Sequence, residues 1–163
     1  MYSIGDKVVH PMHGAGTIKD VKKIVLGGVE REYYVVCFAV GNMISDVPVD
    51  GCEKIGIRDV ISKDEAKKVL EHFRDMEVGD DINWNKRQRE NMQRLKSGDI
   101  YQVAEVLKEL MCRDRRKGLS TSERKTLGSA RQIVLSELIL SGVAGESDIE
   151  MILDDTVLAA GGQ

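Results

Sequence analysis

The chain has 163 residues, of which 42% are hydrophobic and 31% are charged, so it can bury the core of one or two small domains and does not have a disordered composition. This length disfavours one large catalytic domain. The 24 Lys and Arg residues are outnumbered by 27 Asp and Glu residues, and the net charge of −3 would, for an evenly charged chain, argue against a nucleic-acid-binding protein.

The first 60 residues predict a small β-barrel. Extended runs occur at residues 7–10, 17–26, 31–40 and 43–49. Gly27-Gly28 between the second and third runs predicts a hairpin, and Pro48 near the end of the last run is placed where a missing N–H matters least. A flat sheet of four or five short strands would expose both edges, so we expect the sheet to bend strongly and close.

The remainder of the chain predicts a helical bundle. Three stretches match the capping box, in which a Ser hydroxyl and a Glu three residues later satisfy free N–H groups at a helix N-terminus: Ser62 with Glu65, Ser120 with Glu123, and Ser147 with Glu150. Asn83 and Asp99 are further caps, and Gly98, Gly118 and Gly142 are helix ends. With apolar residues at helical spacing, these signals predict four or five helices, at residues 63–74, 84–96, 100–116, 121–141 and 148–159. The expected fold class is α+β, in two domains.

The cysteines and the N-terminal residues indicate a cytoplasmic protein. Cys37, Cys52 and Cys112 are odd in number and widely spaced, so they predict neither a disulfide framework nor a zinc site. Residues 1–6 do not resemble a signal peptide, and no stretch approaches the length of a membrane span. We therefore expect no membrane association, no metal and no other cofactor.

The charges are distributed unevenly along the chain. Residues 82–131 hold 13 basic and six acidic residues, a net charge of +7, whereas the remainder has a net charge of −10. A basic segment of this kind is typical of a surface that faces phosphates, although a solvated helix surface rich in Lys and Arg gives the same pattern. Both explanations stay open from charge alone.

A search for catalytic motifs finds no nucleophile elbow, P-loop or dinucleotide-binding fingerprint. His10 and His13 lie in a turn without a carboxylate partner, which favours a structural or surface role. A methyl-lysine cage would need Tyr33, Tyr34 and Phe38 to converge, but Tyr33 and Tyr34 alternate to opposite faces of one strand. We therefore expect no catalytic residues and no enzymatic activity.

Residues 83–91 read Asn-Trp-Asn-Lys-Arg-Gln-Arg-Glu-Asn and contain the only tryptophan. Trp84 is placed in the first turn of a helix, where an exposed indole could wedge against a base step while the neighbouring cations hold phosphates. Burial of Trp84 in the core is the alternative, because Leu95 lies about 20° away on the same helix face at 100° per residue. Gln88 and Asn91 share this face and make it largely polar, so neither explanation is excluded.

An ordered series of short motifs runs through the chain to about residue 159. The first half contains Gly-Asp-x-Val-Val-x-Pro-x-His-Gly at residues 5–14, Glu32-Tyr33, Val47-Pro48 and Ile55-Gly56-Ile57-Arg58. The second half contains Asn83-Trp84, Ser97-Gly98-Asp99, Val103-Ala104-Glu105-Val106, Gly118-Leu119-Ser120 with Glu123, and Ala130-Arg131 through Glu137-Leu138. This series resembles the CarD/CdnL family of bacterial transcription regulators, and its order makes it far more specific than any one of the motifs.

The resemblance implies a Tudor-like RNA-polymerase-interacting domain at residues 1–60, which binds the polymerase β subunit, and a helical domain at residues 61–160, which contacts promoter DNA just upstream of the −10 element. It implies that Trp84 wedges into the minor groove at the upstream edge of the transcription bubble and stabilises the open complex, in keeping with apolar wedges that distort a duplex. The phosphate contacts implied for the helical domain are Lys86, Arg87, Arg89, Arg124 and Lys125.

For the polymerase contact, the resemblance implies Lys23 and the segment Asp46, Val47 and Pro48. Asp46 is a departure, because characterised members often carry a basic polymerase-contacting residue at this position. We therefore expect a transcription regulator that binds RNA polymerase and holds DNA phosphates without reading a sequence, and that does not require an oligomer. A protein–protein adaptor on RNA polymerase without direct DNA contact is the alternative.

Overall fold

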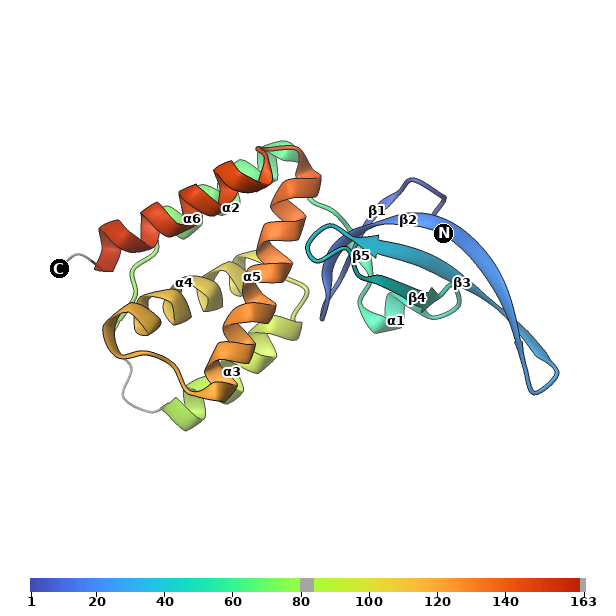
Figure 1. The fold of residues 1–163 in the computed structure, drawn as a ribbon, viewed down its shortest axis with the longest axis horizontal. Helices are drawn as coiled ribbons and strands as arrows, with labels where there is room; N and C mark the ends of the chain where they lie inside the picture. Colours follow the sequence, from blue (N-terminus) through green and yellow to red (C-terminus); the bar gives the residue numbers. More distant parts are fainter. Residues whose placement is uncertain (80–83, 162–163) are drawn as a thin grey trace.

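The computed structural model describes residues 1–79 and 84–161, and for Trp84, Asn85 and Gly161 it describes the backbone alone. The chain forms an N-terminal sheet domain and a C-terminal helical domain that lie side by side (Figure 1). The predicted α+β fold class is confirmed.

The sheet domain contains five antiparallel strands in the order β4-β3-β2-β1-β5. The strands are β1 (Lys7–His10), β2 (Gly14–Leu26), β3 (Val29–Phe38), β4 (Ile44–Pro48) and β5 (Arg58–Asp59), with the short helix α1 (Cys52–Ile55) between β4 and β5. The first four strands follow the predicted runs. The sequence pattern does not predict α1 and β5, because neither is long enough to show a periodicity.

Strands β2 and β3 form the hairpin that Gly27-Gly28 predicts, and both glycines have the positive φ angles, 57° and 79°, that a two-residue hairpin turn requires. The hairpin curves along its length (Figure 1). Gly16 lets β3 approach closely, since an added Cβ would lie 2.7 Å from the carbonyl oxygen of Cys37, and a bulge between Ile18 and Asp20 shifts the register. The curved sheet wraps a core formed by Val8, Ile18, Tyr34, Val36, Phe38, Val47, Cys52 and Ile57.

The helical domain consists, in the part of the chain that the structure describes, of α2 (Lys63–Asp75), α3 (Trp84–Lys96), α4 (Ile100–Lys117), α5 (Thr121–Ser141) and α6 (Glu146–Gly161). Buried side chains of all five helices form one core, which includes Phe73, Leu95, Leu107, Leu138 and Leu153. Burial of such a side chain contributes about 1.5–3 kcal/mol. No helix in the described ranges is both long enough and apolar enough to cross a membrane.

The helix starts follow the predicted caps with one exception. Ser62 accepts the N–H of Glu65, and Ser120 and Glu123 form a complete capping box. The predicted cap at Ser147 is wrong, because α6 begins at Glu146 and its first turn is closed by a hydrogen bond of 3.0 Å from the N–H of Ile149 to the carbonyl of the residue before Glu146. The predicted cap at Asn83 lies outside the described residues.

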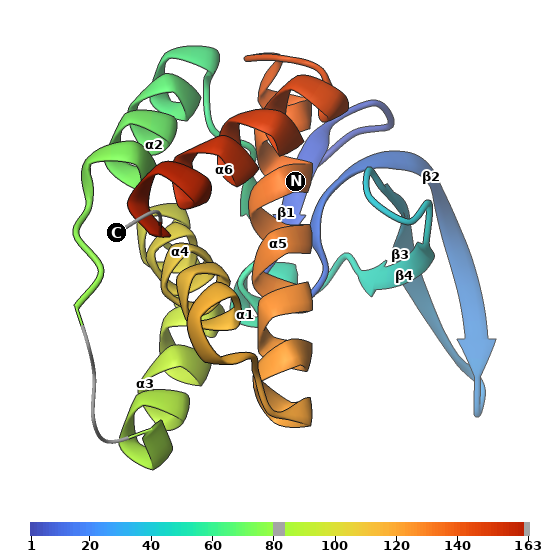
Figure 2. The ribbon, with the colours of Figure 1, turned by 60° about the vertical axis from the view of Figure 1, so that its left-hand side comes forward.

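Helix α5 connects the two domains in space. Its first residues lie at the far end of the helical domain, and its second half packs against the start of β2 (Figures 1 and 2). The backbone N–H of Ala15 in β2 donates a hydrogen bond of 2.8 Å to the hydroxyl of Ser136 in α5. The two domains therefore share a polar, buried contact along one continuous helix.

Candidate functional site

The starts of α3 and α5 lie at the same end of the helical domain (Figure 2). Gln88 of α3 donates a hydrogen bond of 3.1 Å to the hydroxyl of Thr126 in α5, which holds the two helices together at this end. Helix N-termini carry partial positive charge and attract anions. We call this the basic end of the molecule; the cations that α3 and α5 bring to it are Lys86, Arg89, Arg124 and Lys125.

Four of the five predicted phosphate contacts are exposed side chains of the basic end. The Lys86 ammonium lies 4.0 Å from Glu90, and Arg124, whose side chain is 58% exposed, lies 3.3 Å from Asp114. Ion pairs as long and exposed as these are weak, so a phosphate group can compete for the same cations. The geometry thus leaves Arg89, Arg124 and Lys125 exposed at the basic end, where an anionic ligand can reach them.

The fifth predicted contact, Arg87, points into the protein. Its guanidinium is hydrogen-bonded to Glu109 of α4 and lies 3.7 Å from Glu90. Arg94, two turns further along the same face of α3, continues this network with bonds of 2.6 Å to Glu105 and 3.0 Å to Glu109. Arg87 and Arg94 therefore anchor α3 to α4, and part of the positive charge of residues 82–131 is neutralised inside the domain.

The polar face of α3 packs against the domain. Asn91 and Leu95 are both buried, and Gln88 is half-buried against Thr126. A largely polar face of α3 is therefore compatible with packing, because Gln88 donates to Thr126 of α5 and Asn91 accepts a hydrogen bond of 3.3 Å from Arg94 of its own helix. Trp84 begins α3, and its side chain lies outside the described residues, so its wedge role stays a prediction.

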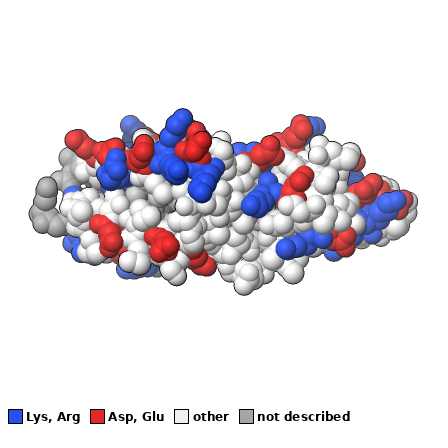
Figure 3. Space-filling view, turned by 90° about the horizontal axis from the view of Figure 1, so that it is seen from above, with Lys and Arg blue, Asp and Glu red and all other residues white. Residues whose placement is uncertain are grey.

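The side of the helical domain formed by α2 and α6, opposite the basic end, carries mixed charge. Viewed from above, Lys and Arg side chains alternate with Asp and Glu side chains rather than gathering into a field of one sign (Figure 3). Arg131 of α5, for example, lies 3.4 Å from Asp154 of α6. This side is typical of a solvated surface.

A second candidate surface lies on the face of the sheet that is turned away from the core. Cross-strand register places Lys22 opposite Tyr33 and places Tyr33 opposite Pro48, so these side chains share one face. We call this the outer sheet face; its members are Lys22, Ile24 and Leu26 of β2, Arg31 and Tyr33 of β3, and Ile44, Asp46 and Pro48 of β4.

The outer sheet face is largely apolar and exposed. Ile44 is 66% exposed and Leu26 is 67% exposed. Single exposed apolar side chains are common on soluble proteins, but several on one face indicate a binding surface. Ile24, Leu26 and Tyr33 also line a shallow cavity of about 170 Å³. Strand β4 is the edge of the sheet, and an edge strand presents unpaired backbone groups that a partner strand can bind.

The predicted polymerase contacts separate onto different faces. Asp46 and Pro48 belong to the outer sheet face, whereas Val47 is buried in the core and Lys23 lies on the other face of the hairpin, 4.0 Å from Glu30. Asp46 forms an ion pair of 2.7 Å with Lys22, which is not among the predicted polymerase contacts. The spacing of Lys22 and Ile24 could have indicated that Lys22 belongs to this face, because side chains two residues apart on a strand share a face.

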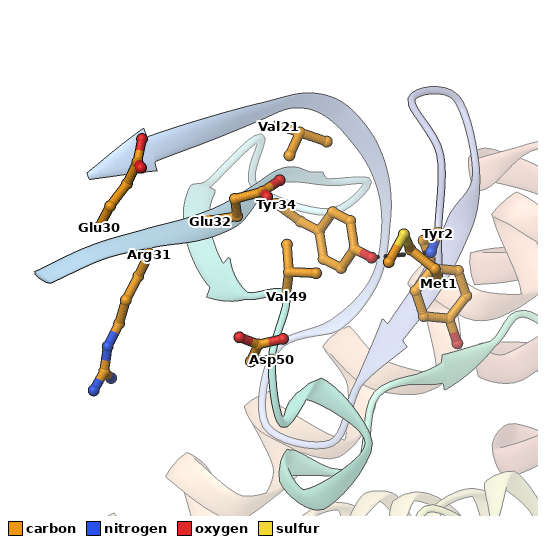
Figure 4. A pocket seen from close by; sticks show the side chains of 9 residues that line it. All are labelled: Met1, Tyr2, Val21, Glu30, Arg31, Glu32, Tyr34, Val49 and Asp50. Carbon is orange, nitrogen blue, oxygen red and sulfur yellow. Dashed lines mark hydrogen bonds between the residues drawn. The ribbon is translucent and has the colours of Figure 1, made fainter. Parts of the chain in front are cut away.

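The inner face of the sheet carries a cavity of about 400 Å³ (Figure 4). Tyr34 is buried at its floor, and the Tyr34 hydroxyl accepts the backbone N–H of Tyr2 at 3.0 Å. Burial, together with Asp59, raises the pKa of Tyr2 to about 12. Tyr33 lies on the opposite face, as strand alternation predicts, so the aromatic rings do not converge into a cage.

His10 and His13 pack on each other, with ring centroids 4.5 Å apart, and both rings contact Phe38. The Nδ1 atom of His10 accepts the backbone N–H of Met12 at 3.0 Å. Burial and the neighbouring His13 lower the pKa of His10 to about 4. The pair therefore stabilises the turn between β1 and β2.

Over the described ranges no three His, Cys, Asp or Glu side chains are grouped so that they could hold a metal ion.

Comparison with known proteins gives a family for both the sheet domain and the helical domain. Residues 2–61 match the sequence model of the CarD-like/TRCF RID domain, and residues 68–154 match that of the CarD C-terminal domain. Over 144 residues, 88% of this chain and 94% of the relative, the chain is 32% identical to the Bacillus subtilis (strain 168) protein named "Putative transcription factor YdeB". The chain belongs to the CarD-like family of transcription factors, which confirms the resemblance and the Tudor-like class of the sheet domain.

Proposed function

We propose that the protein binds the β subunit of RNA polymerase through the sheet domain and promoter DNA near the upstream edge of the −10 element through the basic end, and that it thereby stabilises the open complex. The observation that carries this proposal is that Lys86 and Arg89 of α3 and Arg124 and Lys125 of α5 are exposed on two helices joined by the Gln88–Thr126 bond, in a different domain from the outer sheet face. Two surfaces of different chemistry on two domains of one molecule fit a protein that bridges two partners.

The DNA contact rests on charge rather than on base recognition. Exposed cations suit phosphate oxygens, which carry no sequence information. The half-buried ion pairs of Arg87 and Arg94 hold α3 on α4, so that the start of α3, where Trp84 lies, is held at the basic end. Trp84 as an apolar wedge would then act on DNA that the cations already hold.

The polymerase contact rests on the outer sheet face. An apolar surface of this kind on a soluble domain indicates a protein partner, and the adjacent edge strand β4 can add backbone hydrogen bonds. The Lys22 and Asp46 pair in its centre gives the surface one positive and one negative group. This arrangement explains how the domain can dock although Asp46 replaces the basic residue that is common in the family, because Lys22 supplies a cation beside it.

The experiment that tests the DNA contact measures how the affinity for a polymerase–promoter complex depends on salt, with polymerase lacking DNA as the reference. Each phosphate contact adds about 1 to the slope of log affinity against log salt concentration. We expect the double variant Arg89→Gln and Lys125→Gln to lower the DNA-dependent part of this slope by about 2. Lys67→Gln, which removes an exposed cation of α2, serves as the matched control and should leave the slope unchanged.

A protein–protein adaptor is the second candidate function, and the internal ion pairs of Arg87, Arg94 and Arg113 favour it, because they use cations that DNA would otherwise contact. The same measurement separates the two functions. A slope that DNA does not increase would exclude the phosphate contact and leave the adaptor.

A further inference from the structure

A buried ion pair connects the two domains. The guanidinium of Arg58 in β5 donates two hydrogen bonds, both of 2.6 Å, to the two carboxylate oxygens of Glu137 in α5. The side chain of Glu137 is 0% exposed and that of Arg58 is 28% exposed. Glu137 also accepts the N–H of Ile61 at 3.0 Å, and the Nε of Arg58 donates to the carbonyl of Gly98 at 2.8 Å. These four bonds fix the pair from both domains.

The turn between β1 and β2 lies against the same half of α5. Gln132 donates a hydrogen bond of 3.1 Å to the carbonyl of His13, and Ser136 accepts the N–H of Ala15 at 2.8 Å. Gly14 has a φ of +88°, and a Cβ there would lie 2.4 Å from the hydroxyl of Ser136. The turn and Arg58 therefore both bind the second half of α5 through hydrogen bonds of defined geometry.

The first half of the same helix carries two cations of the basic end, Arg124 and Lys125. From Arg124 to Glu137 the helix spans about 20 Å at 1.5 Å per residue. It is continuous over this length (Figure 1). Any rotation of the sheet domain about its contact with α5 would therefore displace the basic end relative to the outer sheet face.

We propose that Arg58 and Glu137 are positioning residues, which set the orientation of the sheet domain on α5 so that polymerase docking places the basic end on DNA. This inference rests on the proposed function. A buried ion pair contributes little net stability compared with apolar packing, but its fixed geometry can specify one arrangement. Two surfaces held at a fixed separation also have a higher effective concentration for two linked sites than surfaces that reorient freely.

Two variants test the positioning role. Arg58→Lys keeps the positive charge but loses the bidentate contact with Glu137 and the bond to Gly98. Glu137→Gln keeps the side-chain volume but loses the negative charge. Arg74→Lys is the matched control, because Arg74 forms a pair of 2.8 Å with Asp75 that is exposed on both sides. A dispersed NMR spectrum of each full-length variant shows that both domains are folded.

Three measurements are made on each full-length protein: domain alignment by residual dipolar couplings, the separate affinities for polymerase and for DNA, and the gain in open-complex lifetime on a polymerase–promoter complex. We expect the control to match the unmodified protein. In both variants we expect the two domains to lose their common alignment and the lifetime gain to fall about tenfold, with the separate affinities within about twofold of the unmodified protein.

Retention of a common alignment in both variants would overturn the positioning role, and so would an undiminished lifetime gain in a variant whose domains align independently. A variant that lost its separate affinity for polymerase or DNA would show a local structural role instead and would also overturn it. Failure of the proposed function is distinguishable, because the unmodified protein would then give no lifetime gain while its domains kept a common alignment.

Discussion

At the scale of single residues, Gly14 shows how closely the two domains approach. Its φ of +88° disfavours any side chain, and a Cβ would also meet Ser136, so both backbone strain and a clash oppose a substitution. We expect Gly14→Ala to lower the free energy of unfolding by about 3 kcal/mol. Gly28→Ala is the control, since Gly28 has a φ of +79° but no atom near the added Cβ. We expect Gly28→Ala to lower the free energy of unfolding, measured by urea denaturation, by about 1 kcal/mol. Equal losses of stability in the two variants would contradict the close approach of Gly14 to Ser136.

His10 gives a prediction about pH. Its pKa is about 4 in the folded protein, because of burial and His13, against 6.5 for an unperturbed histidine. The unfolded chain therefore binds more protons between these values, so His10 contributes stability above pH 6.5 that is lost as the pH falls through 4. We expect the His10 ring to titrate near pH 4 by NMR and the His10→Asn variant to lose this part of the acid sensitivity. A ring that titrated near pH 6.5 would show that the packing with His13 does not hold in solution.

At the scale of elements, the outer sheet face and the opposite face of the β2–β3 hairpin offer a matched comparison. Ile44 on β4 is 66% exposed, and Val25, which lies on the other face of the hairpin, is 64% exposed. A buried charge without a partner is costly at an interface. We therefore expect Ile44→Glu to weaken polymerase binding at least tenfold and Val25→Glu to leave it within about twofold, as measured by surface plasmon resonance. Equal effects would place the polymerase contact elsewhere.

Local signals predicted most of the elements. The two positive φ angles at Gly27-Gly28 and the capping box of Ser120 and Glu123 arise from neighbours in sequence, and both appear in the structure. The start of α6 was predicted two residues late, because Ser147 fits a cap pattern that the chain does not use. The residues of a hairpin turn or a capping box can be deduced from neighbours in sequence, whereas the choice between competing helix caps depends on packing.

The candidate site was less predictable, because its geometry depends on contacts between distant elements. The basic segment was visible as a charge window, but the ion pair of Arg87 with Glu109 joins residues 22 apart, and no spacing rule on one helix indicates it. Likewise, the burial of Asn91 follows from packing against other helices. The spacing of Lys22 and Ile24 indicates that they share a strand face, but the ion pair of Lys22 with Asp46 across β3 follows only from the strand register.

At the scale of the whole molecule, the proposed function requires that the two surfaces and helix α5, which lies between them, act together to bridge polymerase and DNA. The outer sheet face suits a protein, the basic end suits phosphates, and α5 joins them through the Arg58 and Glu137 pair. A ligand shifts an equilibrium only by its difference in affinity between two states. For a stabiliser of the open complex, the decisive contact is therefore one made in the open complex and not in the closed complex, and Trp84 at the basic end is the residue proposed for it.

The measurement that tests this account most directly is the lifetime of the open complex on one promoter, with purified RNA polymerase and either the unmodified protein or Trp84→Ala, followed after a competitor challenge. We predict that the unmodified protein lengthens the lifetime and that Trp84→Ala loses most of this gain while it still binds polymerase in a pull-down. A Trp84→Ala protein that lengthened the lifetime as much as the unmodified protein would contradict the wedge, and no gain with either protein would contradict the proposed function.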